Sequence, residues 1–506
     1  MKRVLGFLAV ALAATLISLV PSAPAGQASQ TKTPPAMQAT RPSAGEQQHG
    51  LDASDIDHTC KPCEDFYRYV NGNWLSNPKN QIPAAYPAWG RVNLLDEHNR
   101  EILHGILEEA AANKSAEPGS IEQKIGDFYA SCVDTAKIDA AGIHPLDEEL
   151  ASIAKISDVA SLEAEVAHLH GIGTHAMFAF GSTQDLRDST EQTGEADQGG
   201  LGLPNRDYYT KDDDRSKKLR DGYRAHLSKM FGLMGDTMER SAAEAGIVMD
   251  IETKLAESSK SPVDLRDPEA NYHRMSVSDL SAVTPHFDWP GYFREIGFPG
   301  IRVVNAAQPD FLKTLDGLIT SVPIENWNVY LRWHLVHSAA PYLSAPFLNE
   351  NFDFFGRTLT GTTEQVPRWK RCVAATDRDL GEALGQKYVA RAFPPSAKAR
   401  ALEMVHNLID ALREDLKTLS WMSPETRLQA ITKLNAITLK IGYPDKWRDY
   451  SGLRVDRGPY VLNNFRSAQF ETRFDLNKIG KAVDKGEWGM TQPTVNAYYN
   501  PQLNEI

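Results

Sequence analysis

Apolar residues recur at helical spacing along most of the chain after about residue 51. Downstream of Val92 they fall three or four positions apart, which places them on one face of a helix. This set comprises Leu95, Ile102, Leu103, Ile106 and Leu107. The same spacing predicts helices around residues 121–132, 219–230, 247–255, 332–343 and 397–419. We therefore expect helix to dominate the fold.

One more helix is predicted from its boundary signals. Ser423 supplies a capping hydroxyl, Pro424 occupies the first helical position, and Glu425 adds a negative charge to the first turn. The sequence Gly442-Tyr443-Pro444 is a stop signal, so we expect this helix to run to about Lys440.

Strand patterns are few. Two short apolar stretches, residues 177–183 and 301–305, are typical of strands. The chain closes on VNAYYNPQLNEI, in which Val495, Ala497 and Tyr499 alternate with polar positions, as in a half-buried strand. The predicted fold class is therefore mainly α, with a small β component near one end.

The first 50 residues differ from the rest. In residues 1–25, Lys2 and Arg3 precede an apolar run, and the run ends in small residues at Ala23 and Ala25, as in a secretory signal peptide. An uncut membrane anchor is the alternative, because the run nearly reaches spanning length. Residues 26–50 are rich in Pro, Ala, Gln, Ser and Thr and are predicted to be a disordered tether. We expect a periplasmic or secreted protein with no stable membrane span after signal cleavage.

Length and charge narrow the function classes. A chain of 506 residues can form two to four domains. Hydrophobic residues make up 42% and charged residues 24%, as in ordinary soluble proteins. The net charge of −12 argues against a nucleic-acid partner, which would require a basic face.

The four cysteines are Cys60, Cys63, Cys132 and Cys372. In an exported chain an even number of cysteines suggests disulfides. The C-K-P-C sequence is weak as a redox motif or as half of a zinc site, because the chain has no second C-x-x-C.

The common catalytic motifs are absent. The chain has no G-x-S-x-G elbow and no phosphate-binding G-x-x-x-x-G-K-[ST] loop. An H-E-x-x-H helix would direct two imidazoles at one zinc ion with a glutamate beside them. None of the 14 histidines is followed by glutamate, so this motif is absent from the 506 residues.

The remaining histidine and acidic groups favour structural roles. His168, His170 and His175 lie in a stretch interrupted by two glycines, so we interpret it as a surface turn rather than a metal site. His334 and His337 are predicted to be core or interface residues. The acidic run at 212–214 lacks the glycine and downstream glutamate of a calcium loop and is predicted to begin a helix.

The closing strand could bind a peptide. An exposed edge strand can hold an extended peptide through main-chain hydrogen bonds. The Asn496 amide can both donate to and accept from a peptide backbone. Most asparagine residues on strands, however, are merely solvated.

Five blocks of sequence resemble one family in the same order along the chain. They are residues 62–74 (PCEDFYRYVNGNW), 201–209 (LGLPNRDYY), 352–372 (FDFFGRTLTGTTEQVPRWKRC), 441–453 (IGYPDKWRDYSGL) and 496–506 (NAYYNPQLNEI). Together they resemble the neprilysin-type (M13) zinc metallopeptidases over nearly the whole chain after the predicted tether.

This resemblance implies a mainly α, two-lobed neprilysin-like architecture whose lobes enclose a cavity for small peptides. Residues 51–453 would form the helical lobe. Residues 454–506 would begin a zincin-like catalytic lobe, incomplete here, that includes the substrate-binding edge strand. By resemblance, Asn496 and Ala497 bind the substrate backbone.

The family also implies an activity. Its members carry H-E-x-x-H and E-x-x-x-D after this strand, which in this numbering would lie beyond Ile506. The resemblance therefore implies an exported zinc-dependent metalloendopeptidase of oligopeptides, with zinc expected for the complete enzyme. We expect residues 1–506 alone to bind no zinc and to be inactive, with the missing C-terminal segment as a candidate partner. A non-catalytic peptide-binding or scaffold protein is the alternative.

The resemblance also pairs cysteines. Cys132 and Cys372 match positions that form a disulfide in relatives. Cys63 matches a cysteine that, in animal relatives, bonds the far C-terminal region. A Cys60–Cys63 disulfide and a free Cys63 thiol both remain open for this chain.

Overall fold

The computed structural model describes residues 52–506, so the predicted signal peptide and tether lie outside the described residues. By contacts the chain divides into two compact units. The smaller unit ends at Pro83 and also takes in Ala88–Gly90, whereas the larger unit comprises Ala84–Pro87 and Arg91–Ile506.

The smaller unit is built around one helix. It contains α1 (Phe66–Ser76) between the short turns η2 (Ala53–Asp55) and η3 (Pro78–Asn80). The Asp65 side chain caps α1 by accepting the Arg68 backbone N–H, which satisfies an otherwise unpaired donor.

The larger unit is mainly helical, as predicted. The helices predicted around 95–107, 121–132, 219–230, 247–255 and 397–419 are confirmed, although several extend further than expected. The α-helix expected over 332–343 ends at Ala339 instead. Its helices are α2 (Arg91–Ala112), α3 (Ile121–Val133), α4 (Thr135–Ala141), α5 (Asp147–Ile153), α6 (Val159–Gly171), α7 (Asp207–Thr210), α8 (Asp214–Leu233), α9 (Met238–Ser258), α10 (Val277–Val283), α11 (Trp289–Glu295), α12 (Pro309–Ser321), α13 (Ile324–Ala339), α14 (Ala345–Asn351), the π-helical η8 (Phe352–Thr360), α15 (Arg368–Asp379), α16 (Gly381–Ala392), α17 (Pro395–Thr418), α18 (Pro424–Asn435) and α19 (Tyr460–Leu476).

One four-stranded sheet lies within this unit, in the order β1-β2-β4-β3. Its strands are β1 (Phe178–Gln184), β2 (Gln192–Gln198), β3 (Arg274–Ser276) and β4 (Val303–Ala306). β1 and β2 are antiparallel, β2 and β4 are parallel, and β3 and β4 are antiparallel. The sheet therefore falls in the middle of the chain, not near one end as expected.

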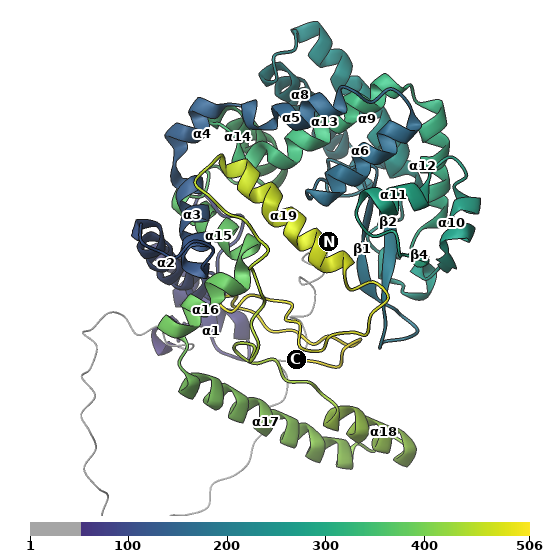
Figure 1. The fold of residues 1–506 in the computed structure, drawn as a ribbon. Coiled ribbons are helices and arrows are strands. Elements are labelled where there is room, and N and C mark those ends of the chain that lie inside the picture. The colour runs from purple at the N-terminus through teal and green to yellow at the C-terminus, as the bar shows by residue number, and fades with distance from the viewer. Residues whose placement is uncertain (1–51) are drawn as a thin grey trace, which may run out of the picture. The chain divides into compact units, whose positions relative to one another are not determined.

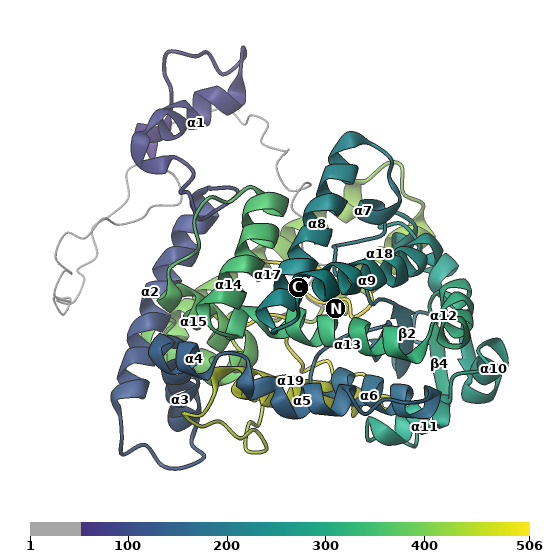
Figure 2. The same cartoon turned by 90° about the horizontal axis from the view of Figure 1, so that it is seen from above.

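Two apolar cores support the helices. The larger core surrounds the sheet and contains the buried rings of Trp289, Trp327 and Trp333. The second core lies among α2, α3, α15 and α16. In Figures 1 and 2, α2, α3 and α15 lie on the opposite side of α13 from α10 and α12. α19 joins the two, because Tyr460 belongs to the second core and Val461 to the larger one.

The boundary signals were only partly correct. The Ser423 side chain accepts the Thr426 N–H, so the predicted cap of α18 is confirmed. The helix ends at Asn435, however, five residues before the expected end. The next residues leave the helical path, and Thr438 and Lys440 bond to the chain around Asn504 and Ile506 instead.

The histidine cluster was also misjudged. α6 continues to Gly171, so His168 and His170 are helical. His170 is buried, with Nδ1 2.7 Å from the Tyr292 hydroxyl and Nε2 2.8 Å from the Ala176 carbonyl oxygen. Gly171 and Gly173 follow His168 and His170, so the helix ends only after both histidines.

Candidate functional site

The chain after α19 follows an irregular path that begins beside the sheet. Gly480 donates its backbone N–H to the Gln192 carbonyl (2.8 Å), and Gln192 donates back to Lys481 (2.9 Å). Val483 donates to the Thr190 carbonyl at 2.8 Å. These bonds extend the β1–β2 hairpin by a short stretch and fix the start of the closing segment.

The segment then packs closely against α16. A Cβ atom on Gly385 would lie 1.7 Å from Gln492 Oε1, so a larger residue at this position would require the Gln492 side chain to move. The Thr491 hydroxyl donates to Asp377 at 3.0 Å, and the Asn99 amide donates to the Pro493 carbonyl at 2.8 Å. Residues 491–493 are thus held by α2, α15 and α16.

The final residues turn back on themselves and join the chain after α18. Asn500 and Glu505 exchange backbone hydrogen bonds of 2.9 and 3.2 Å across a tight turn. Thr438 donates its N–H to the Asn504 carbonyl, Lys440 donates to Ile506, and Ile506 donates back to Thr438. The end of the described chain is therefore well anchored.

Buried charges reinforce this anchor. Glu505 and Lys440 form an ion pair whose side chains are only 2% and 5% exposed. The Tyr498 hydroxyl donates to Glu505 Oε1 at 2.9 Å. Burial, together with the Glu505 carboxylate, raises the pKa of Tyr498, so its hydroxyl stays protonated as a donor. Tyr498 thus has a structural role in this anchor.

Asn496 and Ala497 lie between these two anchored stretches, and both are exposed. The predicted strand over Val495–Tyr499 is wrong, because no other part of residues 52–506 pairs with it as a strand. Instead the Asn496 side-chain oxygen accepts the Ala497 N–H at 2.8 Å. Such a local bond competes with a sheet ladder, which the alternating pattern alone does not reveal.

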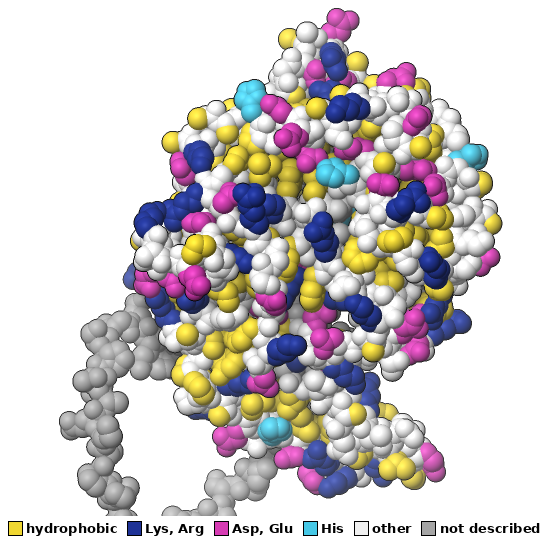
Figure 3. Space-filling view, viewed as in Figure 1, with side chains coloured by type: hydrophobic (Ala, Val, Ile, Leu, Met, Phe, Trp, Pro, Cys, Tyr) yellow, Lys and Arg dark blue, Asp and Glu magenta, His cyan; other side chains and the backbone are white. Residues whose placement is uncertain are grey.

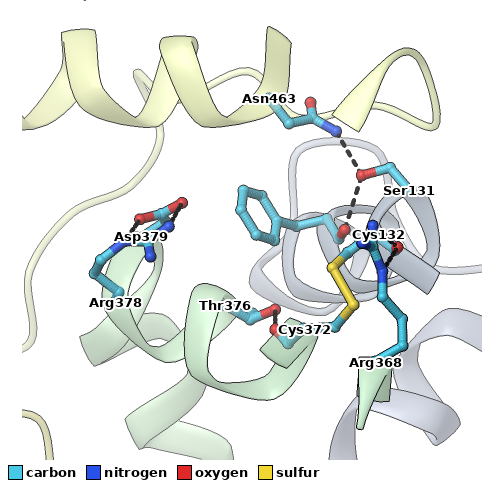
Figure 4. Close-up of a disulfide and its surroundings, with 9 residues drawn as sticks. Ser131, Cys132, Arg368, Cys372, Thr376, Arg378, Asp379 and Asn463 are labelled. Atoms are coloured by element: carbon cyan, nitrogen blue, oxygen red, sulfur yellow. Dashed lines mark hydrogen bonds and ion pairs between the residues drawn. A yellow bond between two sulfur atoms is a disulfide. The ribbon is translucent and has the colours of Figure 1, made fainter. Parts of the chain in front are cut away.

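The Cys132–Cys372 disulfide joins α3 to α15, with Cα atoms 5.7 Å apart (Figure 4). Arg368 donates from Nε (2.9 Å) and Nη2 (2.6 Å) to the Cys132 carbonyl, and Thr376 donates to the Cys372 carbonyl at 2.9 Å. These bonds satisfy main-chain oxygens beside the disulfide.

Polar bonds surround the same junction. Asn463 on α19 donates to the Ser131 hydroxyl at 3.0 Å, and that hydroxyl donates to the Phe128 carbonyl (Figure 4).

In the smaller unit, Cys60 and Cys63 are free thiols in this structure, so the Cys60–Cys63 disulfide is not formed.

Comparisons with known proteins define the class. A model described as peptidase family M13, for its N-terminal part, matches residues 62–444. The chain therefore belongs to peptidase family M13.

Particular relatives agree with this assignment. Human endothelin-converting enzyme 1 is 31% identical over 481 residues, covering 90% of this chain and 60% of that protein. Neprilysin-3 of Drosophila melanogaster is 30% identical over 89% of this chain and 60% of its own length. The chain thus spans about 60% of the length of these relatives.

Solved structures share the fold. Zinc metalloprotease ZMP1 of Mycobacterium tuberculosis, in complex with an inhibitor, matches with a TM-score of 0.84 and 36% identity, covering 90% of this chain and 69% of that one. PepO from Lactobacillus rhamnosis matches at 20% identity and a TM-score of 0.77. The predicted mainly α metallopeptidase fold is confirmed.

The zinc of this family does not fit the residues around Asn496. Within residues 52–506, the group of three ligand-type side chains that could hold a metal is Glu149, Glu165 and His168, on α5 and α6. The 506 residues contain no H-E-x-x-H. No catalytic step through zinc is therefore derived for this chain.

Several anchoring residues escaped sequence reasoning. Lys440 and Glu505 are far apart along the chain, and neither lies in a recognisable motif. Gln492 also lies in no recognisable motif, and the place where it packs on α16 is marked only by Gly385.

Among the described residues no helix is both long and apolar enough to cross a bilayer.

Proposed function

We propose that this chain forms the substrate-enclosing part of an exported zinc-dependent metalloendopeptidase that cleaves oligopeptides. The observation that carries the proposal is membership of peptidase family M13 over most of the chain, together with the match to an inhibitor-bound zinc metalloprotease. The proposal includes the helical lobe at 51–453, the start of a catalytic lobe at 454–506, and export through residues 1–25.

Asn496 and Ala497 are proposed to bind the substrate backbone. They are exposed, yet the chain on both sides of them is fixed by hydrogen bonds, close packing and the Lys440–Glu505 ion pair. A fixed, exposed segment can pair with an extended peptide at a low cost in ordering. The Asn496 Nδ2 group is the natural donor to a peptide carbonyl, since its Oδ1 already accepts a local bond.

Residues 1–506 alone are proposed to be inactive, because they contain no H-E-x-x-H. The test compares two proteins: the product of the whole reading frame, read past the codon for Ile506, and the chain ending at Ile506. Each is assayed with zinc and a library of quenched fluorescent oligopeptides. We expect hydrolysis by the whole product and none by the shorter chain.

Each result decides one part of the proposal. Hydrolysis by the shorter chain, abolished by a chelator, would overturn the proposed inactivity. A whole product that binds the peptides but cleaves none of them would favour the peptide-binding alternative over the peptidase.

The role of Asn496 has its own prediction. In the whole product, Asn496→Ala should raise KM for oligopeptides about tenfold, the value of one lost hydrogen bond of about 1–1.5 kcal/mol. Gln502→Ala is the matched control, since its side chain is also exposed on the closing segment. Equal KM values for the two variants would remove Asn496 from the substrate site.

A further inference from the structure

Helices α5 and α6 bring together three side chains of metal-ligand type. Glu165 and His168 are three positions apart on α6, so they share one face of that helix. Glu149 reaches them from α5, and His168 Nε2 lies 2.6 Å from Glu149 Oε2. One ligand atom from each of the three residues lies within 4.8 Å of the others.

Glu165 is the unusual member of this group. Its residue is only 7% exposed, and Oε2 accepts a hydrogen bond from the Ser152 hydroxyl at 2.5 Å. Oε1 is buried and has no hydrogen-bond partner among the described residues. A buried carboxylate oxygen without a partner is unfavourable, and a cation beside it would satisfy it.

Space for an ion exists at this place. A cavity of about 290 Å³ is lined by Glu165 and His168 and by the polar side chains of Ser152, Lys155 and Ser161. The cavity is large enough to admit a hydrated ion and the waters that would complete its coordination. Glu165 and His168 thus line this space together with the apolar side chains of Ile156 and Ala164, and Glu149 approaches His168 from outside the lining.

We propose that Glu149, Glu165 and His168 bind a divalent transition-metal ion, with Zn²⁺ as the preferred ion. One imidazole nitrogen and two carboxylates form a ligand set that zinc accepts, with a water at the fourth position. Tetrahedral zinc holds its ligand atoms about 3.4 Å apart, given bonds of about 2.1 Å. To reach this spacing, His168 Nε2 and Glu149 Oε2, now 2.6 Å apart, would separate, and all three ligand atoms already lie within 4.8 Å of one another.

The bound ion would tie α5 to α6. It would also displace the direct contact between Glu149 and His168, placing the metal where that hydrogen bond now lies. This site differs from the expectation that residues 1–506 bind no zinc. Sequence spacing did not reveal it, because Glu149 lies on a separate helix, 19 residues before His168.

The test is a zinc titration of the purified chain carrying Cys60→Ser and Cys63→Ser, which removes the free thiols as competing ligands. After chelator treatment and dialysis, isothermal titration with ZnCl₂ at pH 7.5 should show one equivalent bound with a Kd of about 10 μM or tighter. Glu165→Gln and His168→Gln, made in the same background, should each weaken binding at least tenfold.

His144→Gln is the matched control. His144 Nδ1 lies 3.1 Å from Asp147 Oδ2 in a highly exposed pair next to α5. This variant should bind zinc as its parent does. The proposal would be overturned if the parent took up no zinc, or if both Glu165→Gln and His168→Gln bound zinc as the parent does. Glu149 and His168 would then form only a hydrogen-bonded pair.

A second readout separates binding from folding. Far-UV circular dichroism at room temperature checks that each variant is folded, and thermal melts are recorded with and without zinc. Zinc should raise the melting temperature of the parent and of His144→Gln but not that of His168→Gln. Equal stabilisation by Mg²⁺, undiminished in His168→Gln, would contradict a transition-metal site. Neither readout depends on peptidase activity.

Discussion

Glu252 on α9 is a fully buried carboxylate that several donors surround. Tyr209 donates its hydroxyl at 2.7 Å, Tyr223 donates at 3.2 Å, and the Gly202 backbone N–H donates at 3.1 Å. His334 Nε2 lies 3.1 Å from the same carboxylate. The buried Glu252 carboxylate thus fixes the conformation of residues 201–209. This block, one of the five that resemble the M13 family, therefore has a structural role.

Gly202 shows how little space this cluster leaves. A Cβ atom there would lie 1.8 Å from the Tyr223 hydroxyl oxygen. We expect Gly202→Ala to lower the free energy of unfolding by about 1–3 kcal/mol, because the added methyl group must displace that hydroxyl or the backbone. Denaturant unfolding followed by circular dichroism measures this change.

Gly246→Ala is the control for that substitution. Gly246 is also in α9, and a Cβ atom there would meet nothing within 4 Å. Alanine should therefore stabilise the helix by about 0.5–1 kcal/mol. If both variants lost the same stability, close packing at Gly202 would not be the cause.

His337 on α13 predicts a dependence of stability on pH. Its ring stacks on Trp333 with centroids 5.0 Å apart, and burial lowers the pKa of His337 to about 3, with the nearby imidazoles of His334 and His226 adding to the effect. A depressed pKa in the folded state means that the unfolded chain binds the proton more readily. The contribution of His337 is therefore fully present above about pH 6.5 and is lost as pH falls below it.

The measurement is unfolding at pH 7.5 and pH 5. His337→Gln should lose less stability between these two values than the parent does, by about 1–2 kcal/mol. The exposed residue His144 again provides a control, since His144→Gln should keep the parental dependence. A parental slope in His337→Gln would show that this imidazole does not titrate differently in the two states.

At the scale of elements, the disulfide is the covalent link between α3 and α15, across 240 residues. Replacing Cys132 and Cys372 together by alanine should lower the free energy of unfolding by about 2–5 kcal/mol, because the unfolded chain regains the freedom of a very long loop. The Cys60→Ala and Cys63→Ala pair should change stability much less, since these thiols are free. Equal losses in both pairs would contradict this account.

The strands show which elements the local pattern can predict. β1 and β4 are apolar and were predicted correctly. β2, with the sequence QTGEADQ, was not predicted, because its residues have little preference for strands. It forms because β1 and β4 pair with its two edges, and Gly194 leaves room for the Phe180 ring and Val304. Tertiary pairing here overrides local preference.

At the scale of the whole larger unit, Figure 3 shows acidic and basic side chains interspersed over the visible face, with apolar side chains among them. α17 carries an exposed apolar stripe. Met404, Leu408 and Leu412 recur every four residues and are 58%, 63% and 46% exposed, and Trp421 just after the helix is 75% exposed. Contiguous exposed apolar surface of this kind promotes association.

The stripe gives a prediction for solution behaviour. Replacing Leu408 and Leu412 together by glutamine should reduce concentration-dependent association of the chain ending at Ile506, measured by light scattering after size-exclusion chromatography. The melting temperature should change little, because both side chains are exposed. Asn407→Gln, an exposed polar change on the same helix, is the control. If association persisted in the double variant, the surface responsible for it would lie elsewhere on the molecule.

The sequence by itself determined the helical class of this protein, most of its long helices, the cap at Ser423 and the family to which it belongs. These features depend on residues within a few positions of one another or on continuous blocks, so local spacing records them. Only the tertiary structure decided that Val495–Tyr499 is not a strand, that Lys440 meets Glu505, and that Glu149 meets Glu165 and His168. Each of these outcomes depends on which distant segment lies alongside, and burial and hydrogen bonding between such segments leave no periodic trace in the chain.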